Sequence, residues 1–132
     1  MNRILAALAV CAGMLFSAIP IAAHHSFEAE YDRTQKVTLK GTVTRVEWQN
    51  PHVYYYVDVA DPNGTVVNWA IEVGAPNGLY RAGWRKDSLK IGDQVTVEGF
   101  RAKAGGPHIN GNSVVLANGK KVFNGTADQT AN

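Results

Sequence analysis

The sequence predicts a mostly β domain that follows a cleavable export signal. Three observations lead to this prediction. An apolar run opens the chain, apolar and polar residues then alternate over most of residues 34–123, and one short stretch within that range breaks the alternation. Alternation with period two is typical of half-buried strands, so strands are expected to dominate the domain.

The first 23 residues have the three parts of a secretory signal peptide. Arg3 supplies a positive start, the stretch from Ile4 to Ile21 is apolar, and Ala22 and Ala23 offer small residues to a signal peptidase. A membrane anchor is the alternative, because about 20 apolar residues can span a bilayer. Export to a bacterial periplasm is the prediction, with cleavage after either alanine.

Composition limits what the exported chain can do. Removal of residues 1–23 takes away Arg3, so 12 of the 13 basic residues face 11 acidic ones and the net charge is +1. This near-neutral charge gives no strong attraction to nucleic acid or to a membrane surface. The single cysteine, Cys11, lies inside the signal, so the exported chain has no disulfide and no thiolate ligand.

Three strands are expected before the helix. The first carries Val37, Leu39, Gly41 and Val43 on one face, the second Val53, Tyr55, Val57 and Val59, and the third Val67, Trp69, Ile71 and Val73. After Val43 the apolar phase shifts to Val46, which predicts a β-bulge or sharp bend near Gly41. The segment 61–64 is a strong hairpin turn between the second and third strands.

A short helix within Ala75–Gly83 is expected next, since Pro76 suits a first helical turn. A fourth strand then carries Val95 and Val97, and a fifth begins near Ser113 after a glycine-rich loop. Three strands, a helix and two strands are the order of the OB-fold. We therefore expect a five-stranded OB-fold-like Greek-key barrel with one short helix between strands three and four. A β-sandwich is the competing architecture.

These elements divide the chain into four parts. Residues 1–23 are the signal peptide, 24–33 an N-terminal leader, 34–123 the barrel domain and 124–132 a flexible polar tail.

Five sequence segments together resemble a known family. The segments are HHSF at 24–27, VEWQNPH at 46–52, NWAIEVGAPN at 68–77, GW at 83–84 and GDQVTVEGF at 92–100. As a set they resemble a family of small exported bacterial proteins of unknown function. The resemblance implies an OB-like barrel and periplasmic export. It implies no activity and assigns no functional residue.

The histidines are the candidate metal ligands. His24 and His25 open the predicted mature chain, and His52 and His108 are expected on loops. Imidazole nitrogen binds Cu(II), Ni(II) and Zn(II), and a free terminal amine next to histidine adds a second nitrogen donor. Cleavage after Ala23 and cleavage after Ala22 give two different chelates, both suited to Cu(II). The alternative is an ordinary polar leader with locally bonded loop histidines.

Tyr54 and Tyr56 are the candidate ligand-binding residues. They lie on the face of the second strand opposite Val53 and Tyr55, where an OB-fold binds its ligands. Exposed tyrosines there can stack on rings, although they can equally cover the other side of a curved sheet.

No familiar catalytic pattern occurs, so no catalytic residue is assigned. The prediction is a periplasmic, non-enzymatic binding module that takes a divalent transition metal, Cu(II) first. The alternative is a metal-free barrel that binds a small ligand or a periplasmic protein through the strand-two tyrosines. An enzyme ranks last.

Overall fold

The computed structural model describes residues 27–125, with the side chain of residue 124 left out. Its elements are α2 (Phe27–Glu30), β1 (Tyr31–Glu47), β2 (Tyr54–Ala60), β3 (Val66–Glu72), α3 (Pro76–Arg81), β4 (Gln94–Ala102), β5 (His108–Leu116) and β6 (Lys121–Asn124). The protein is therefore mostly β, as predicted, with two short helices in this part of the chain. None of its helices there is long and apolar enough to cross a membrane.

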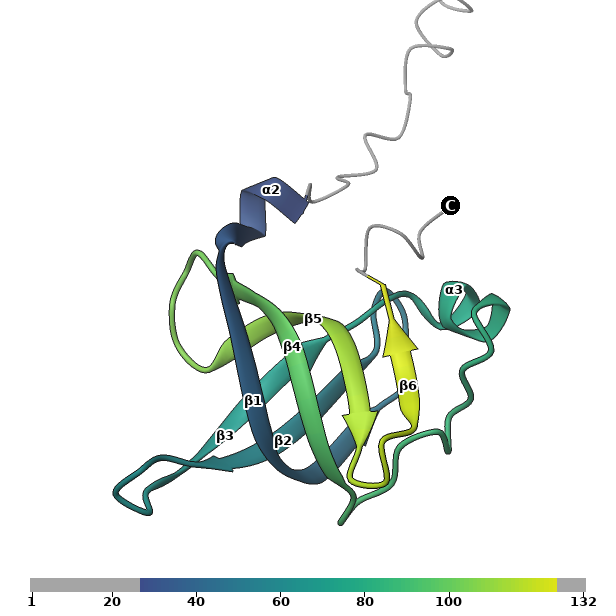
Figure 1. The fold of residues 1–132 in the computed structure, drawn as a ribbon. Coiled ribbons are helices and arrows are strands. Elements are labelled where there is room, and N and C mark those ends of the chain that lie inside the picture. Colours follow the sequence, from purple (N-terminus) through teal and green to yellow (C-terminus); the bar gives the residue numbers. More distant parts are fainter. Residues whose placement is uncertain (1–26, 126–132) are drawn as a thin grey trace, which may run out of the picture.

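One sheet closes into a ring. Its strand order is β3-β2-β1-β4-β5-β6, and a further pairing joins β3 to β5 (Figure 1). Adjacent strands are antiparallel, whereas the closing pair is parallel and aligns Ala70 with His108 and Glu72 with Asn110. The helix α3 lies between β3 and β4, where the sequence places it.

The expected strand count of five is wrong, because residues 121–124 form a sixth strand. β6 pairs with β5 through Val114 and Phe123. Phe123 is buried and packs edge-on against the buried Trp84, 5.1 Å between ring centroids. The apolar area that Phe123 buries stabilises this short edge strand. Residues 27–33, assigned to the leader by sequence, form α2 and the first part of β1.

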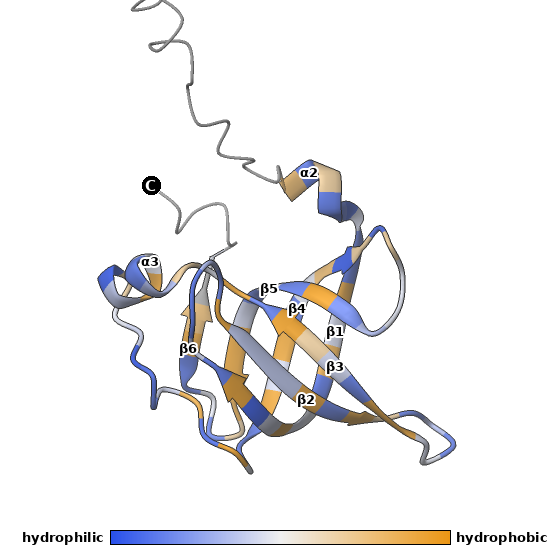
Figure 2. Ribbon diagram, turned by 180° about the vertical axis from the view of Figure 1, so that it is seen from behind, coloured by the Kyte–Doolittle hydropathy of each residue, from blue (hydrophilic) through white to orange (hydrophobic). Residues whose placement is uncertain are grey.

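The predicted strand phases are confirmed. Along β2 and β3, Val57 and Ile71 are buried while their neighbours alternate outward, and hydrophobic and hydrophilic bands follow one another along the strands in Figure 2. Most residues expected on the apolar strand faces are buried, among them Leu39, Val43, Val57, Ile71, Val95 and Val97, while Val37, Val59 and Trp69 are partly buried against them. The same core also contains Leu79, Trp84, Leu89, Ile109, Val114 and Phe123.

The predicted bend in the first strand also appears. The register of β1 against β2 shifts between Val43 and Arg45, which is the mark of a bulge. A side chain at Gly41 would collide with the carbonyl oxygen of Asp58, so the strands approach closely where β1 bends. This bend lets one 17-residue strand pair with β2 at one end and with β4 along the rest.

The helix α2 lies at the start of β1, beside the loop between β4 and β5 (Figure 1). The amide of Lys103 in that loop donates to the carbonyl of Glu30 at 2.8 Å, and its Nζ donates to the carbonyl of Glu28 at 2.5 Å. Phe27 packs on Tyr31 and on Phe100 of β4. These contacts hold the first residues of the described chain over one end of the ring.

Candidate functional site

A buried carboxylate organises the candidate site. Glu72 is the last residue of β3 and follows the core residue Ile71, so alternation directs its side chain to the outer face of the sheet. It is nevertheless only 3% exposed, because side chains from four other segments cover it. We call Glu72, Tyr31, His52, Tyr54 and His108 the Glu72 cluster.

Both tyrosines of the cluster donate to the same carboxylate oxygen. The Tyr54 hydroxyl donates to Glu72 Oε2 at 2.7 Å, and the Tyr31 hydroxyl makes a short hydrogen bond to the same atom. An ionised carboxylate only accepts hydrogen bonds, so both phenol protons point to it.

Both imidazoles of the cluster also reach Glu72. His52 Nδ1 lies 2.5 Å from Oε1. His108 Nε2 lies 3.7 Å from Oε2 and 3.1 Å from the Tyr31 hydroxyl oxygen. Each histidine side chain is 35% exposed. The two rings therefore sit between a buried anion and the surface.

Strand pairing explains how residues so distant in sequence meet. Tyr54 is the register partner of Glu72 in the β2–β3 hairpin. The parallel β3–β5 contact brings His108 beside Ala70, two residues from Glu72 on the same edge. His52 lies in the loop just before β2, and Tyr31 starts β1.

The electrostatics of the cluster favour a carboxylate anion. Burial alone would raise the pKa of Glu72, but the neighbouring His108 and His52 imidazoles and the hydrogen bonds from Tyr31 and Tyr54 outweigh burial and lower that pKa to about 2. Burial and the hydrogen bond to Glu72 raise the pKa values of Tyr31 and Tyr54, so both stay protonated donors. Glu72 is thus a fixed negative charge at neutral pH.

A second buried polar side chain lies beside the cluster. Asn110 pairs with Glu72 in register and follows His108 by two residues, so the alternation of β5 places all three on one face. Asn110 is fully buried, and its Nδ2 and Oδ1 atoms have no hydrogen-bond partner among residues 27–125. An unpaired buried amide costs stability, which makes this face chemically unlike the apolar core.

The structure brings two of the four predicted histidines together. His52 is in a loop, as expected. His108 is not in a loop: it is the first residue of β5, because the parallel pairing with β3 extends that strand ahead of the expected start. His24 and His25 lie outside the described residues.

The predicted tyrosines have different surroundings. Tyr54 and Tyr56 are both half-buried on the outer face of β2. Tyr54 belongs to the Glu72 cluster, whereas the Tyr56 hydroxyl donates to Glu47 at 3.1 Å and the Arg45 guanidinium lies 3.7 Å from the Tyr56 ring centroid. The Tyr56 ring is therefore already partly covered by Arg45, and the Tyr54 hydroxyl is already hydrogen-bonded to Glu72.

Sequence reasoning missed Glu72 and Tyr31. Glu72 occupies an outward position of a predicted strand, where a solvated carboxylate is ordinary, and Tyr31 stands in the expected leader. The only signal was Glu72 itself, flanked by Ile71 and Val73 at the end of a buried strand.

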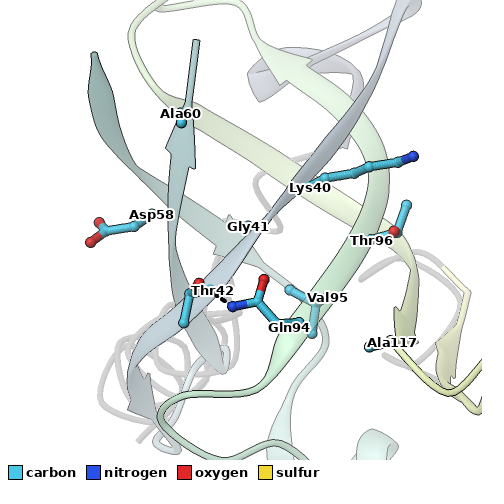
Figure 3. Close-up of a pocket in the computed structure, with 9 residues that line it drawn as sticks. All are labelled: Lys40, Gly41, Thr42, Asp58, Ala60, Gln94, Val95, Thr96 and Ala117. Atoms are coloured by element: carbon cyan, nitrogen blue, oxygen red, sulfur yellow. Dashed lines mark hydrogen bonds between the residues drawn. The ribbon is translucent and has the colours of Figure 1, made fainter. Parts of the chain in front are cut away.

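Two hollows differ in what surrounds them. The larger, about 430 Å³, is lined by a mixture of charged, polar and small aliphatic residues that includes Lys40, Thr42 and Gln94, and Gln94 Nε2 donates a hydrogen bond to Thr42 Oγ1 at 2.6 Å (Figure 3). It contains none of the candidate residues. A smaller hollow of about 250 Å³ adjoins the cluster, lined by Ala29, Glu30, Tyr31, Ala102, Ala104 and His108.

Residues 27–125 contain no group of three or more His, Cys, Asp or Glu side chains arranged to hold a metal ion. Within that range, the cluster supplies two imidazoles and a carboxylate that is already bonded to the tyrosines. A complete metal site needs donors from elsewhere.

Fold and site together define a small closed-sheet β protein with a buried carboxylate–histidine–tyrosine cluster on its outer face. Residues 12–111 match a protein family described as "Family of unknown function (DUF6152)", and the chain belongs to this family. The matched range contains the whole Glu72 cluster and His24 and His25. No curated protein and no solved structure matches the chain.

Proposed function

We propose that the protein is a periplasmic, non-enzymatic, OB-like module that binds a divalent transition metal, Cu(II) above others, at the Glu72 cluster. One observation carries the proposal: His52 and His108, far apart in sequence, both reach the carboxylate of Glu72. The remaining donors come from His24 and His25 at the start of the exported chain.

The topology supports the OB-like description. Strand pairing runs in a cycle through β1, β2, β3, β5 and β4, the β3–β5 contact is parallel, and α3 stands between β3 and β4. An OB-fold binds ligands on its second and third strands and adjoining loops. The cluster uses Tyr54, Glu72 and the loop residue His52 from that region.

The donor chemistry supports a nitrogen site. Each imidazole uses one ring nitrogen toward the Glu72 or Tyr31 oxygens, which leaves its other ring nitrogen for a metal. Imidazole suits Cu(II), Ni(II) and Zn(II), and among these divalent ions Cu(II) binds nitrogen ligands most tightly. Two imidazoles alone leave a metal open to water, so further nitrogen donors strengthen the site.

Chain length supports a contribution from the first mature residues. Phe27 stacks on Tyr31, with 5.3 Å between ring centroids, and Tyr31 is a member of the cluster. His24 and His25 precede Phe27 by three and two residues. An extended chain spans up to about 3.5 Å per residue, so these positions lie within about 10 Å of Phe27. Cleavage after Ala22 or Ala23 gives a free amine next to this histidine pair.

Calorimetric titration with Cu(II) and Zn(II) tests the proposal on the mature protein with its native N-terminus. We expect tighter binding of Cu(II), weakening as pH falls through the range near 6.5 where imidazole takes up a proton. His52→Ala and His108→Ala should each weaken binding, as should a tag placed before His24. Glu98→Gln, a surface carboxylate on β4 outside the cluster, keeps every imidazole and is the control. Equal weak binding by all variants would exclude the proposed site.

The predicted export and signal cleavage are tested by mass spectrometry. Intact mass of the periplasmic protein should correspond to loss of residues 1–22 or 1–23 and so identify the amine that is available. Full-length mass in the membrane fraction would instead support an anchor and would remove the free amine from the proposal.

A metal-free binding function is the alternative, and the hollow of about 250 Å³ beside Tyr31 and His108 favours it. A small ligand there would meet alanine side chains together with the His108 imidazole, the Tyr31 phenol and Glu30. Ligand or protein binding that is unaffected by a chelator and by His52→Ala would support this alternative over the metal site.

A further inference from the structure

We infer that Glu72 is a positioning residue that, together with the Tyr31 hydroxyl, sets which ring nitrogen each histidine presents to the metal: Nε2 of His52 and Nδ1 of His108. This inference rests on the proposed function for its purpose, but the proton positions that it specifies exist in the metal-free protein.

The contact of His52 with the carboxylate sets its proton. Nδ1 lies 2.5 Å from Glu72 Oε1, a distance at which a lone pair on nitrogen would face a lone pair on oxygen. Nδ1 therefore carries the proton. In a neutral imidazole only one nitrogen is protonated, so Nε2 holds the free lone pair.

The direction of the Tyr31 hydroxyl proton determines which nitrogen of His108 is protonated. A hydroxyl has one hydrogen, and the Tyr31 hydroxyl donates it to Glu72. The same oxygen lies 3.1 Å from His108 Nε2, so this second contact needs a proton on the histidine nitrogen. His108 is therefore protonated on Nε2 and presents Nδ1.

Glu72 can orient both histidines because its own carboxylate is held in place. It is 3% exposed, and Oε2 accepts from both tyrosines while Oε1 faces His52. A carboxylate behind a metal-binding histidine fixes the ring orientation and increases its basicity. Here one carboxylate acts on two histidines, one directly and one through a hydroxyl, and both rings are ordered before a metal arrives.

Long-range ¹H–¹⁵N NMR of the metal-free mature protein at pH 9, where imidazoles hold one proton, measures the two tautomers directly. We expect His52 in the Nδ1–H form and His108 in the Nε2–H form. Tyr31→Phe removes the acceptor of His108 alone, so it should mix the tautomers of His108 and leave His52 unchanged. Glu72→Gln keeps one acceptor oxygen instead of two. It should mix the tautomers of His52, or those of both histidines if the amide nitrogen also displaces the Tyr31 hydroxyl.

Copper affinity supplies the second readout. Glu72→Gln should weaken Cu(II) binding about 10- to 100-fold, as loss of such an outer partner generally does. Glu98→Gln, a surface carboxylate on β4 that pairs with Lys36, is the matched control and should change nothing.

Different results overturn different statements. Copper binding with His52 in the Nε2–H form, or with Glu72→Gln at full affinity, overturns the positioning role and leaves the proposed function standing. The expected tautomers in a protein that binds no copper overturn the proposed function, and with it the purpose assigned to Glu72.

Discussion

The last two residues of β3, Ile71 and Glu72, are both buried, but on opposite faces and among side chains of different chemistry. Ile71 points inward and is fully buried among aliphatic and aromatic side chains, whereas the next residue, Glu72, points outward and is 3% exposed among hydroxyls and imidazoles. The core is stabilised by removal of apolar area from water. The cluster instead contains a charge that accepts hydrogen bonds from Tyr31 and Tyr54 and faces His52. Burial at the end of one strand therefore rests on apolar packing on one face and on a hydrogen-bonded charge on the other.

Truncation of the core should have the largest effect. Ile71→Ala removes buried methylene groups and leaves a cavity, so we expect a loss of roughly 2 to 5 kcal/mol in the free energy of unfolding. Denaturant unfolding measures it. Val66→Ala on the same strand, at a position 57% exposed, should cost less than about 1 kcal/mol. Equal losses at the two positions would contradict the assignment of faces.

Removal of the Glu72 charge should lower the free energy of unfolding somewhat less than Ile71→Ala, and the size of this loss should depend on pH. The folded pKa of Glu72, about 2, lies below its ordinary value of 4.5. The resulting stability is fully present above pH 4.5 and is lost as pH falls through about 2, as linkage requires. A shift of this size corresponds to about 3 kcal/mol. Without metal, Glu72→Gln should therefore be less stable at pH 7 and lose less stability on acidification.

Glu98→Gln is the matched control for the acid measurement, because Glu98 is an exposed carboxylate on β4. It should retain the acid dependence of the parent protein. If Glu72→Gln keeps the full loss of stability between pH 4.5 and 2, Glu72 does not carry a depressed pKa and the cluster is not a fixed anion.

An ion pair outside both regions should have the smallest effect. Arg33 lies 2.6 Å from Glu28, and both side chains are largely exposed. Exposed pairs of this kind contribute at most about 1 kcal/mol. Arg33→Ala should lower the free energy of unfolding by less than that and leave copper affinity unchanged. A loss as large as that of Ile71→Ala would mean that α2 contributes to the core.

The core was predictable because its signal is local. Alternation alone assigns Leu39, Val57, Ile71 and Val97 to one buried set, and the strand order places a helix after β3. The short strand β6 was not counted because its stability comes from Phe123 against Trp84, a contact between distant residues. Leu89 was likewise outside the predicted core, since no alternation marks the segment after α3.

The cluster was only half predictable because it depends on pairings between distant strands. Histidine chemistry selected His52 and His108 from the sequence, but their meeting depends on the parallel contact of β3 with β5. That contact also turned the expected loop at His108 into a strand. Glu72 gave only a weak local sign, its place between Ile71 and Val73, since a glutamate at an outward strand position is ordinarily solvated.

Anomalous scattering at the copper edge, from crystals of the mature protein loaded with Cu(II), locates the metal relative to His52, His108 and Glu72. We expect a copper peak about 2 Å from Nε2 of His52 and from Nδ1 of His108, with Glu72 behind both rings and not bound to the metal. A peak held by His24 and His25 alone, with His52 and His108 still turned only toward Glu72, would contradict it.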